Sequence, residues 1–215
     1  MILYEPFKTR PLSDFRAELH FEYPELPDQL WDYYLVKVAI DMAKRGNFVR
    51  RRIALQAQPC VTRYQLKSPD GLDICGILGI RHATCGHCHT HKVHRTFDPP
   101  EYSACCSKEV AWYDIYENVF HIHHDHCAGM YYITVAVAPE MGACELPVVF
   151  YDELLQPLLY GVKGQVLMLA GKSWTNLQLG KAYTDEYRNS IGQYAQDFLT
   201  RKQRGIVHMN FGKVM

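Results

Sequence analysis

The sequence predicts an α+β fold, in which helices at both ends of the chain form a frame around a central antiparallel β region. Three observations lead to this prediction. Apolar residues recur every three to four positions over residues 13–48 and again over 151–204, which is typical of amphipathic helices. Over residues 49–138, short runs of alternating apolar and polar residues indicate strands. The order of helices, strands and helices favours an α+β arrangement over a doubly wound sheet.

The amino-terminal zone, residues 13–48, is expected to form a short and a longer helix. Ser13 can cap the first, and Pro24 and Pro27 interrupt the pattern. The second begins at about Asp28, and Gly46 is placed to end it. Its apolar face consists of Leu30, Trp31, Tyr34, Leu35, Val38 and Met42.

The central zone, residues 49–138, is expected to form strands joined by short turns. The sequence Ser68-Pro69-Asp70-Gly71 is a turn signal between two of them. Two further strands, over 119–124 and 130–137, are expected to pair as a hairpin whose turn runs from Asp125 to Gly129.

The carboxyl-terminal zone, residues 151–204, is expected to form two helices. Asp152 can cap the first, which carries Gly161 and Gly164 and ends near Gly171. The second begins at about Asn176. One stripe along it carries Leu179, Tyr183, Tyr187, Ile191, Tyr194 and Phe198.

Composition indicates one globular domain spanning residues 1–215, since 48% of the residues are hydrophobic and no linker divides the chain. The 23 Lys and Arg residues balance the 23 Asp and Glu residues, so only a local patch could attract nucleic acid or an anionic membrane. Such a patch consists of Lys44, Arg45, Arg50, Arg51 and Arg52. No apolar run suggests a signal peptide or a spanning helix, so we expect folding in a cytosol.

Cysteine and histidine gather between residues 82 and 127, and the excursion at about 82–108 is the chemical anomaly of the sequence. In a reducing compartment, free thiols or metal ligands are better expectations than disulfides. Cys85 and Cys88 form a C-x-x-C pair that, with Cys105 and Cys106, could hold a structural zinc ion. The alternative is a surface excursion without metal. A zinc-dependent nucleic-acid-binding module would need more basic residues near the pair.

Residues 121–126 fit the pattern H-x-H-x-D-H, which resembles the metal-binding signature of the metallo-β-lactamase superfamily. That resemblance implies a metal-dependent hydrolase. Such an enzyme needs further ligands downstream, where the only histidine is His208. The hairpin interpretation accounts for the same residues without catalysis, by placing His121 and His123 on one face of a strand.

Several segments along residues 13–204 resemble the head-to-tail adaptor, or connector, proteins of tailed bacteriophages. The opening helices, the strands around Pro69-Asp70-Gly71 and the strand pair ending at Pro139 carry part of the resemblance. The more specific part is a helix with Gly161 and Gly164, then Gly171-Lys172-Ser173-Trp174, then a long final helix. The excursion between Ala83 and Lys108 departs from the family pattern.

The resemblance implies a structural virion protein of the neck and no enzyme, with no catalytic residue and no required cofactor. It implies assembly in the host cytoplasm into a ring, usually twelve-fold, that binds the portal and the tail tube or nozzle. Double-stranded DNA would cross the lumen without sequence-specific contacts, and no membrane would be involved. The candidate interface residues are Gly161, Gly164, Tyr183, Tyr187, Ile191, Tyr194, Phe198 and, in an apolar arm over 205–215, Phe211.

Overall fold

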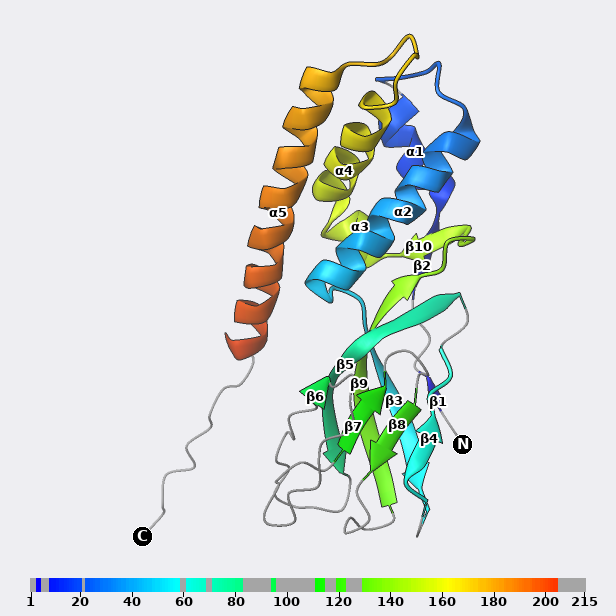
Figure 1. Ribbon diagram of the computed structural model, residues 1–215, viewed down its shortest axis with the longest axis vertical. Coiled ribbons are helices and arrows are strands. Elements are labelled where there is room, and N and C mark those ends of the chain that lie inside the picture. The colour runs from blue at the N-terminus through cyan, green and yellow to red at the C-terminus, as the bar shows by residue number, and fades with distance from the viewer. Residues whose placement is uncertain are drawn as a thin grey trace.

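The computed structural model shows an α+β fold, which confirms the predicted class. It describes residues 3–4, 8–20, 22–58, 61–68, 71–82, 94–95, 111–114, 119–122 and 129–204. The helices lie together at one end of an elongated molecule, and the longer strands lie at the other (Figure 1). Between them lies a short antiparallel pair, β2 (Thr9–Pro11) with β10 (Glu145–Pro147).

The helical layer consists of α1 (Leu12–His20), α2 (Asp28–Gly46), α3 (Val149–Asp152), α4 (Leu155–Leu167) and α5 (Leu177–Arg204). Within it, α4 packs against both α2 and α5, and α1 packs against α2. The last turns of α5 extend past the ends of α2 and α4, so that this helix forms one long edge of the molecule (Figure 1).

The boundaries of α2 follow from its sequence. Pro27 precedes the helix in an extended conformation, with φ −62° and ψ 141°, and Asp28 places a negative charge in the first turn. The helix ends at Gly46, as predicted, but the residue that turns the chain is Asn47, in the left-handed region at φ 50°. Gly46 is required for packing instead, because an added Cβ would lie 2.0 Å from the Phe48 ring.

The main sheet contains four strands in the order β1-β3-β9-β5, all antiparallel. Their bounds are β1 Leu3–Tyr4, β3 Arg50–Ala57, β9 Gly129–Pro139 and β5 Leu72–His82. Ile53, Ile133 and Ile80 are directly opposed across β3, β9 and β5, and all three are buried. In β3 the alternating apolar residues Ile53 and Leu55 are both buried, so the alternation in the sequence marks the core-facing side of that strand.

A second sheet has the order β4-β8-β7-β6. Its strands are β4 (Arg63–Gln65), β8 (Val119–Ile122), β7 (Ala111–Asp114) and β6 (His94–Arg95). β4, β8 and β7 pair antiparallel, as predicted, whereas β6 and β7 are parallel.

The predicted hairpin of strands 119–124 and 130–137 is wrong. β8 pairs with β4 and β7 in the second sheet, whereas β9 lies between β3 and β5 in the main sheet. Closeness in sequence favours pairing of β8 with β9, but both edges of β9 are occupied by strands from earlier in the chain. Backbone groups paired in that way have no further hydrogen bonds to offer.

The strands on either side of Pro69-Asp70-Gly71, which the adaptor resemblance implies are paired, are not partners. β4 belongs to the second sheet and β5 to the main sheet, so the chain crosses between sheets at this point. Gly71 has φ +71°, a conformation that favours glycine and that fits the predicted change of direction.

In the carboxyl-terminal zone, one predicted cap is correct and another is not. The Asn176 side chain accepts a 3.0 Å hydrogen bond from the Leu179 backbone N–H, so it caps α5. Asp152 instead ends the short α3, and α4 begins after Leu154 without a side-chain cap. α4 also ends at Leu167, earlier than predicted, and Gly171 lies in the following turn at φ +74°.

The hydrophobic core joins the helical layer to the main sheet. Trp31, Leu35 and Met42 of α2 are fully buried, and α2 packs against β9, which contributes the buried Val135 and Val137. This arrangement fixes the orientation of α2, and with it the direction in which its polar face points.

Candidate functional site

Several predicted site residues lie outside the described part of the chain. These are the metal-ligand candidates Cys85, Cys88, Cys105 and Cys106, together with Phe211 of the predicted arm. Over the described residues, no group of three His, Cys, Asp or Glu side chains is placed to hold a metal ion. The zinc site therefore stays a prediction.

His121, the first residue of the H-x-H-x-D-H pattern, lies in β8. It is opposite Trp112 of β7 and Arg63 of β4, and it is half-buried. Positions 123–126 of the pattern lie outside the described residues. The metal-dependent hydrolase therefore also stays a prediction.

The two glycines predicted to face another subunit lie at helix contacts within the chain. An added Cβ at Gly161 would lie 2.5 Å from Val38 Cγ1 and 2.8 Å from the Tyr187 ring. At Gly164 it would lie 2.7 Å from Thr184 Oγ1. The close approach that they allow is thus between α4 and its neighbours α2 and α5. Both glycines are buried at these contacts.

The predicted aromatic stripe of α5 divides into buried and exposed members. Tyr187 and Ile191 are buried against the helical layer. Tyr183 is half-buried and stacks on Tyr160 of α4, with ring centroids 5.9 Å apart. Tyr194 is 37% exposed. Phe198 lies in α5, but its side chain lies outside the description.

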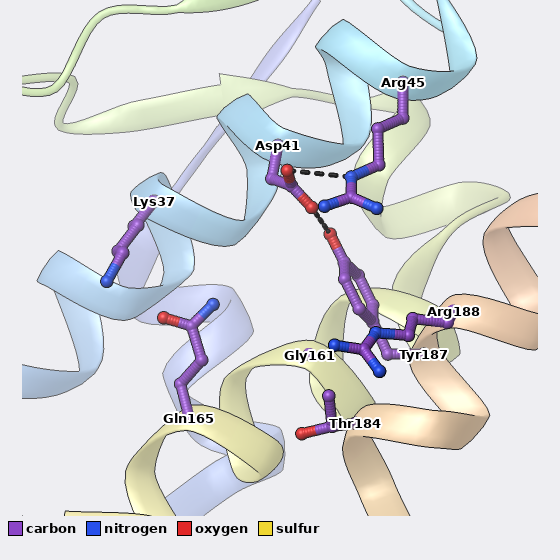
Figure 2. Close-up of a pocket in the computed structure, with 8 residues that line it drawn as sticks. All are labelled: Lys37, Asp41, Arg45, Gly161, Gln165, Thr184, Tyr187 and Arg188. Atoms are coloured by element: carbon purple, nitrogen blue, oxygen red, sulfur yellow. Dashed lines mark hydrogen bonds and ion pairs between the residues drawn. The ribbon is translucent and has the colours of Figure 1, made fainter.

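A pocket of about 240 Å³ opens where α2, α4 and α5 meet (Figure 2). α2 contributes three charged side chains, α4 contributes Gly161 and Gln165, and α5 contributes the rest. Its lining residues are Lys37, Asp41, Arg45, Gly161, Gln165, Thr184, Tyr187 and Arg188. This is the candidate functional site, because charged and amide groups from three helices surround it.

Asp41 accepts hydrogen bonds from two other residues of the pocket. It accepts a 2.9 Å hydrogen bond from Arg45 Nε and a 2.6 Å hydrogen bond from the Tyr187 hydroxyl (Figure 2). Arg45 lies one helical turn after Asp41, whereas Tyr187 comes from α5. The carboxylate therefore links α5 to α2, and each of its two oxygens accepts one hydrogen bond.

The titration of the pocket groups follows from this arrangement. Burial raises the pKa of the Tyr187 hydroxyl, and its hydrogen bond to Asp41 raises the pKa further. The hydrogen bond from Arg45 to Asp41 likewise raises the pKa of Arg45. Tyr187 is therefore a neutral hydrogen-bond donor at physiological pH, and an acid–base role in catalysis does not suit it.

Lys37 and Arg188 carry the other positive charges of the pocket. Lys37 Nζ lies 5.4 Å from the centroid of the Tyr34 ring, within the range of a cation–π contact. Arg188 Nη1 lies 3.7 Å from Asp185 Oδ1, and both side chains of this pair are more than half exposed. In the close-up, Lys37 and Gln165 lie on one side of the pocket and the Arg188 guanidinium on the other (Figure 2).

The basic patch noted in the sequence is divided in the structure. Arg45 pairs with Asp41 at the pocket, and Arg50 donates a 3.0 Å hydrogen bond to the backbone oxygen of Asn47. Burial lowers the pKa of Arg50. The patch is therefore partly occupied by contacts within the subunit, so it does not act as a single exposed basic surface.

Sequence reasoning missed the pocket. One local signal for it exists: Lys37, Asp41 and Arg45 recur every four residues and therefore lie on one polar face of α2. That spacing is common on solvated helices and does not by itself indicate a site. Gln165 and Arg188 could be added only once the packing of α4 and α5 was known.

Exposed apolar side chains gather near the connection between α4 and α5. Leu177 is 61% exposed and Met168 is 49% exposed, and Leu179 lies in the first turn of α5. Large exposed side chains near one another favour a protein contact over a purely solvated surface.

The fold and the pocket define an α+β protein with a helical layer at one end, mainly antiparallel sheets at the other and a charged three-helix pocket. No protein-family model matches the sequence, and no curated protein matches it. None of the helices in the described part of the chain has the length and apolar character needed to cross a membrane.

Proposed function

We propose that this chain is a structural subunit of a tailed-bacteriophage particle, the head-to-tail adaptor that forms a ring between portal and tail. The observation that carries the proposal is the placement of α5. This helix of 28 residues lines one edge of the molecule and leaves apolar side chains exposed at its amino-terminal end and at Tyr194. A long exposed helix of this kind suits lateral contact between identical subunits.

The separation of layers also supports the proposal. A ring subunit needs a stiff body for lateral contacts and a projecting part for the next ring. Here the helices lie at one end and the longer strands at the other (Figure 1). The glycine-mediated contacts of α4 with α2 and α5 make the helical body tightly packed.

In the proposed particle, the subunits form a homo-oligomeric ring, usually twelve-fold in this family, at the head–tail junction. The ring binds the portal on one face and the tail tube or nozzle on the other. Double-stranded DNA crosses the lumen without sequence-specific contacts, which suits a chain whose 23 positive and 23 negative side chains balance. Its role is mechanical joining, with no catalysis and no membrane contact.

The alternative is a zinc-binding module or a metallo-β-lactamase-like hydrolase. The specific observation in its favour is the pattern of His121, His123, Asp125 and His126 in the sequence. The four cysteines Cys85, Cys88, Cys105 and Cys106 could instead hold a structural zinc ion in an adaptor. A structural zinc ion is therefore compatible with either function, whereas hydrolysis is compatible only with the enzyme.

Native mass spectrometry of the purified chain, combined with metal analysis, tests the proposal. The adaptor predicts closed oligomers whose masses are whole multiples of 24.9 kDa, seen as rings by negative-stain microscopy, alone or on portal rings. A monomer at every concentration, with two bound metal ions and hydrolysis of a test lactam or ester, would overturn it. His121→Ala and His123→Ala are the matched variants, since only the hydrolase needs these imidazoles.

A further inference from the structure

The pocket has an excess of positive charge after its internal contacts are made. Asp41 is shared between Arg45 and Tyr187, which leaves Lys37 and Arg188 as the pocket cations that are not bonded to it. Among the described residues Lys37 makes no ion pair, and the 3.7 Å contact of Arg188 with Asp185 is an exposed and weak one. An anionic group between these two cations would gain from both.

The shape and lining of the pocket favour the carboxylate of a protein side chain. A volume of about 240 Å³ accommodates one side chain. Gly161 and the ring of Tyr187 offer an apolar surface for its methylene groups. Lys37, Gln165 and Arg188, which line the pocket, all carry hydrogen-bond donors suited to carboxylate oxygens (Figure 2). A glutamate, with an aliphatic stem and a carboxylate end, matches this combination.

The same chain presents carboxylates of this kind on a different surface. We call this surface the acidic edge and define it by Glu18, Glu22, Glu25 and Asp28, which lie on α1, in the following loop and at the start of α2. All four are exposed. Glu22 is paired with Lys163, Glu25 accepts a 3.0 Å hydrogen bond from the Ser173 hydroxyl, and Asp28 is bonded to Arg16 and His20. Among the described residues, Glu18 of α1 is the member of the acidic edge with no such partner. α1 lies on the other side of the helical layer from α5 (Figure 1).

A closed ring of identical subunits joins two different surfaces of each subunit, because head-to-tail contacts are heterologous. A positive pocket and the exposed Glu18 of α1, on the other side of the helical layer from α5, are complementary groups for such a contact.

We propose that the pocket formed by α2, α4 and α5 binds the Glu18 carboxylate from the acidic edge of a second copy of this chain. The inference rests on the proposed ring function, since it names the contact by which neighbouring subunits recognise one another. Lys37 and Arg188 hold the carboxylate, and Asp41 holds Arg45 and Tyr187 in place around it.

Zero-length carbodiimide crosslinking tests this contact directly, because the reagent joins a lysine amine only to a carboxylate in contact with it. Full-length protein labelled with ¹⁵N is mixed with unlabelled protein, allowed to exchange and crosslinked. We expect peptides of mixed isotope composition that join Lys37 to Glu18. Lys44 is exposed on the same helix outside the pocket and serves as the control for non-specific linking.

Matched charge variants give a second readout. Lys37→Gln and Arg188→Gln should each weaken self-association about fivefold, as for the stronger partly exposed ion pairs. Lys44→Gln and Lys181→Gln remove the same charge outside the pocket and should change association less than twofold, within the effect expected of surface charges. Arg188→Glu should disrupt assembly, and a carboxylate-to-lysine change on the acidic edge, tested first with Glu18→Lys, should restore it.

The outcomes separate this inference from the proposed function. Oligomers that form without a Lys37 crosslink, and with no effect of either pocket variant, would overturn the pocket contact and leave the ring function standing. A chain that never associates would overturn both. Binding of a 30-base-pair DNA duplex that depends on Lys37 and Arg188, without any dependence of self-association on them, would assign the pocket to nucleic-acid phosphates instead.

Discussion

The Tyr187 hydroxyl of α5 donates a 2.6 Å hydrogen bond to Asp41 of α2, across 146 positions of sequence. The ring of Tyr187 meanwhile lies against Gly161 of α4. One buried side chain therefore touches three helices and connects the packing of the helical layer to the charge arrangement of the pocket.

Removal of this hydrogen bond should be measurable as a loss of stability. Tyr187→Phe keeps the ring contact with Gly161 and deletes the hydroxyl, so the free energy of unfolding should fall by about 1–2 kcal/mol. Urea denaturation followed by circular dichroism measures the change. Tyr194→Phe, at a 37% exposed position of the same helix, should change stability by less than about 0.5 kcal/mol. Equal effects of the two substitutions would contradict the role given to the Asp41 contact.

The glycines of the helical layer should differ sharply in their tolerance of a methyl group. Gly161→Ala would place Cβ 2.5 Å from Val38 Cγ1, and the resulting overpacking should cost about 1–3 kcal/mol. Gly192→Ala adds the same atom to α5 where nothing lies within 4 Å, so helix propensity should make the protein more stable by about 0.5–1 kcal/mol. Thermal unfolding of both variants tests the prediction, and stabilisation by Gly161→Ala would refute the close contact of α4 with α2.

The end of α2 should depend on the conformation of Asn47. Because this residue has φ 50° and ψ 38°, Asn47→Gly should leave stability unchanged or improve it, whereas the β-branched Asn47→Val should cost about 1–2 kcal/mol. Chemical denaturation distinguishes the two. A similar stability for both variants would mean that the left-handed residue does not determine where the helix stops.

The acidic edge should contribute a pH-dependent part of the stability. The hydrogen bond from His20 and the nearby Arg16 guanidinium hold the pKa of Asp28 below its usual value. A carboxylate with a lowered pKa stabilises the folded state above its unfolded pKa, and that contribution is lost as the pH falls through the folded pKa. Asp28→Asn should therefore be less stable than the wild type at neutral pH, and the two should converge in acid. Denaturation of both proteins at several pH values between neutral and acid measures this difference. A constant difference in the free energy of unfolding over that range would contradict the prediction.

Much of the helical layer could be predicted from the sequence, because its signals are local. The apolar spacing of Trp31, Leu35 and Met42 predicted α2, and Asn176 predicted the start of α5. The same reasoning failed where a local capping signal competed with burial of nearby side chains in the core. Asp152 is a good capping residue, yet it lies at the end of α3, since the Leu154 and Leu158 side chains are buried in the core and set where α4 begins.

Strand pairing and the pocket required the tertiary structure. Alternation along β8 and β9 identified strands but could not name their partners, and the hairpin predicted from their closeness in sequence does not form. The three-helix pocket could not be predicted from the sequence either, because only Lys37, Asp41 and Arg45 of its lining residues share a local spacing.

The sequence by itself determined the α+β class, the faces that are buried and the ends of several helices, because these depend on neighbours within about one helical turn or one strand. The tertiary structure decided which strands are partners, that Gly161 and Gly164 pack inside the subunit, and that Lys37 and Arg188 flank one pocket. Those features depend on which buried surfaces fit together over long distances in the chain, and no local pattern encodes that fit.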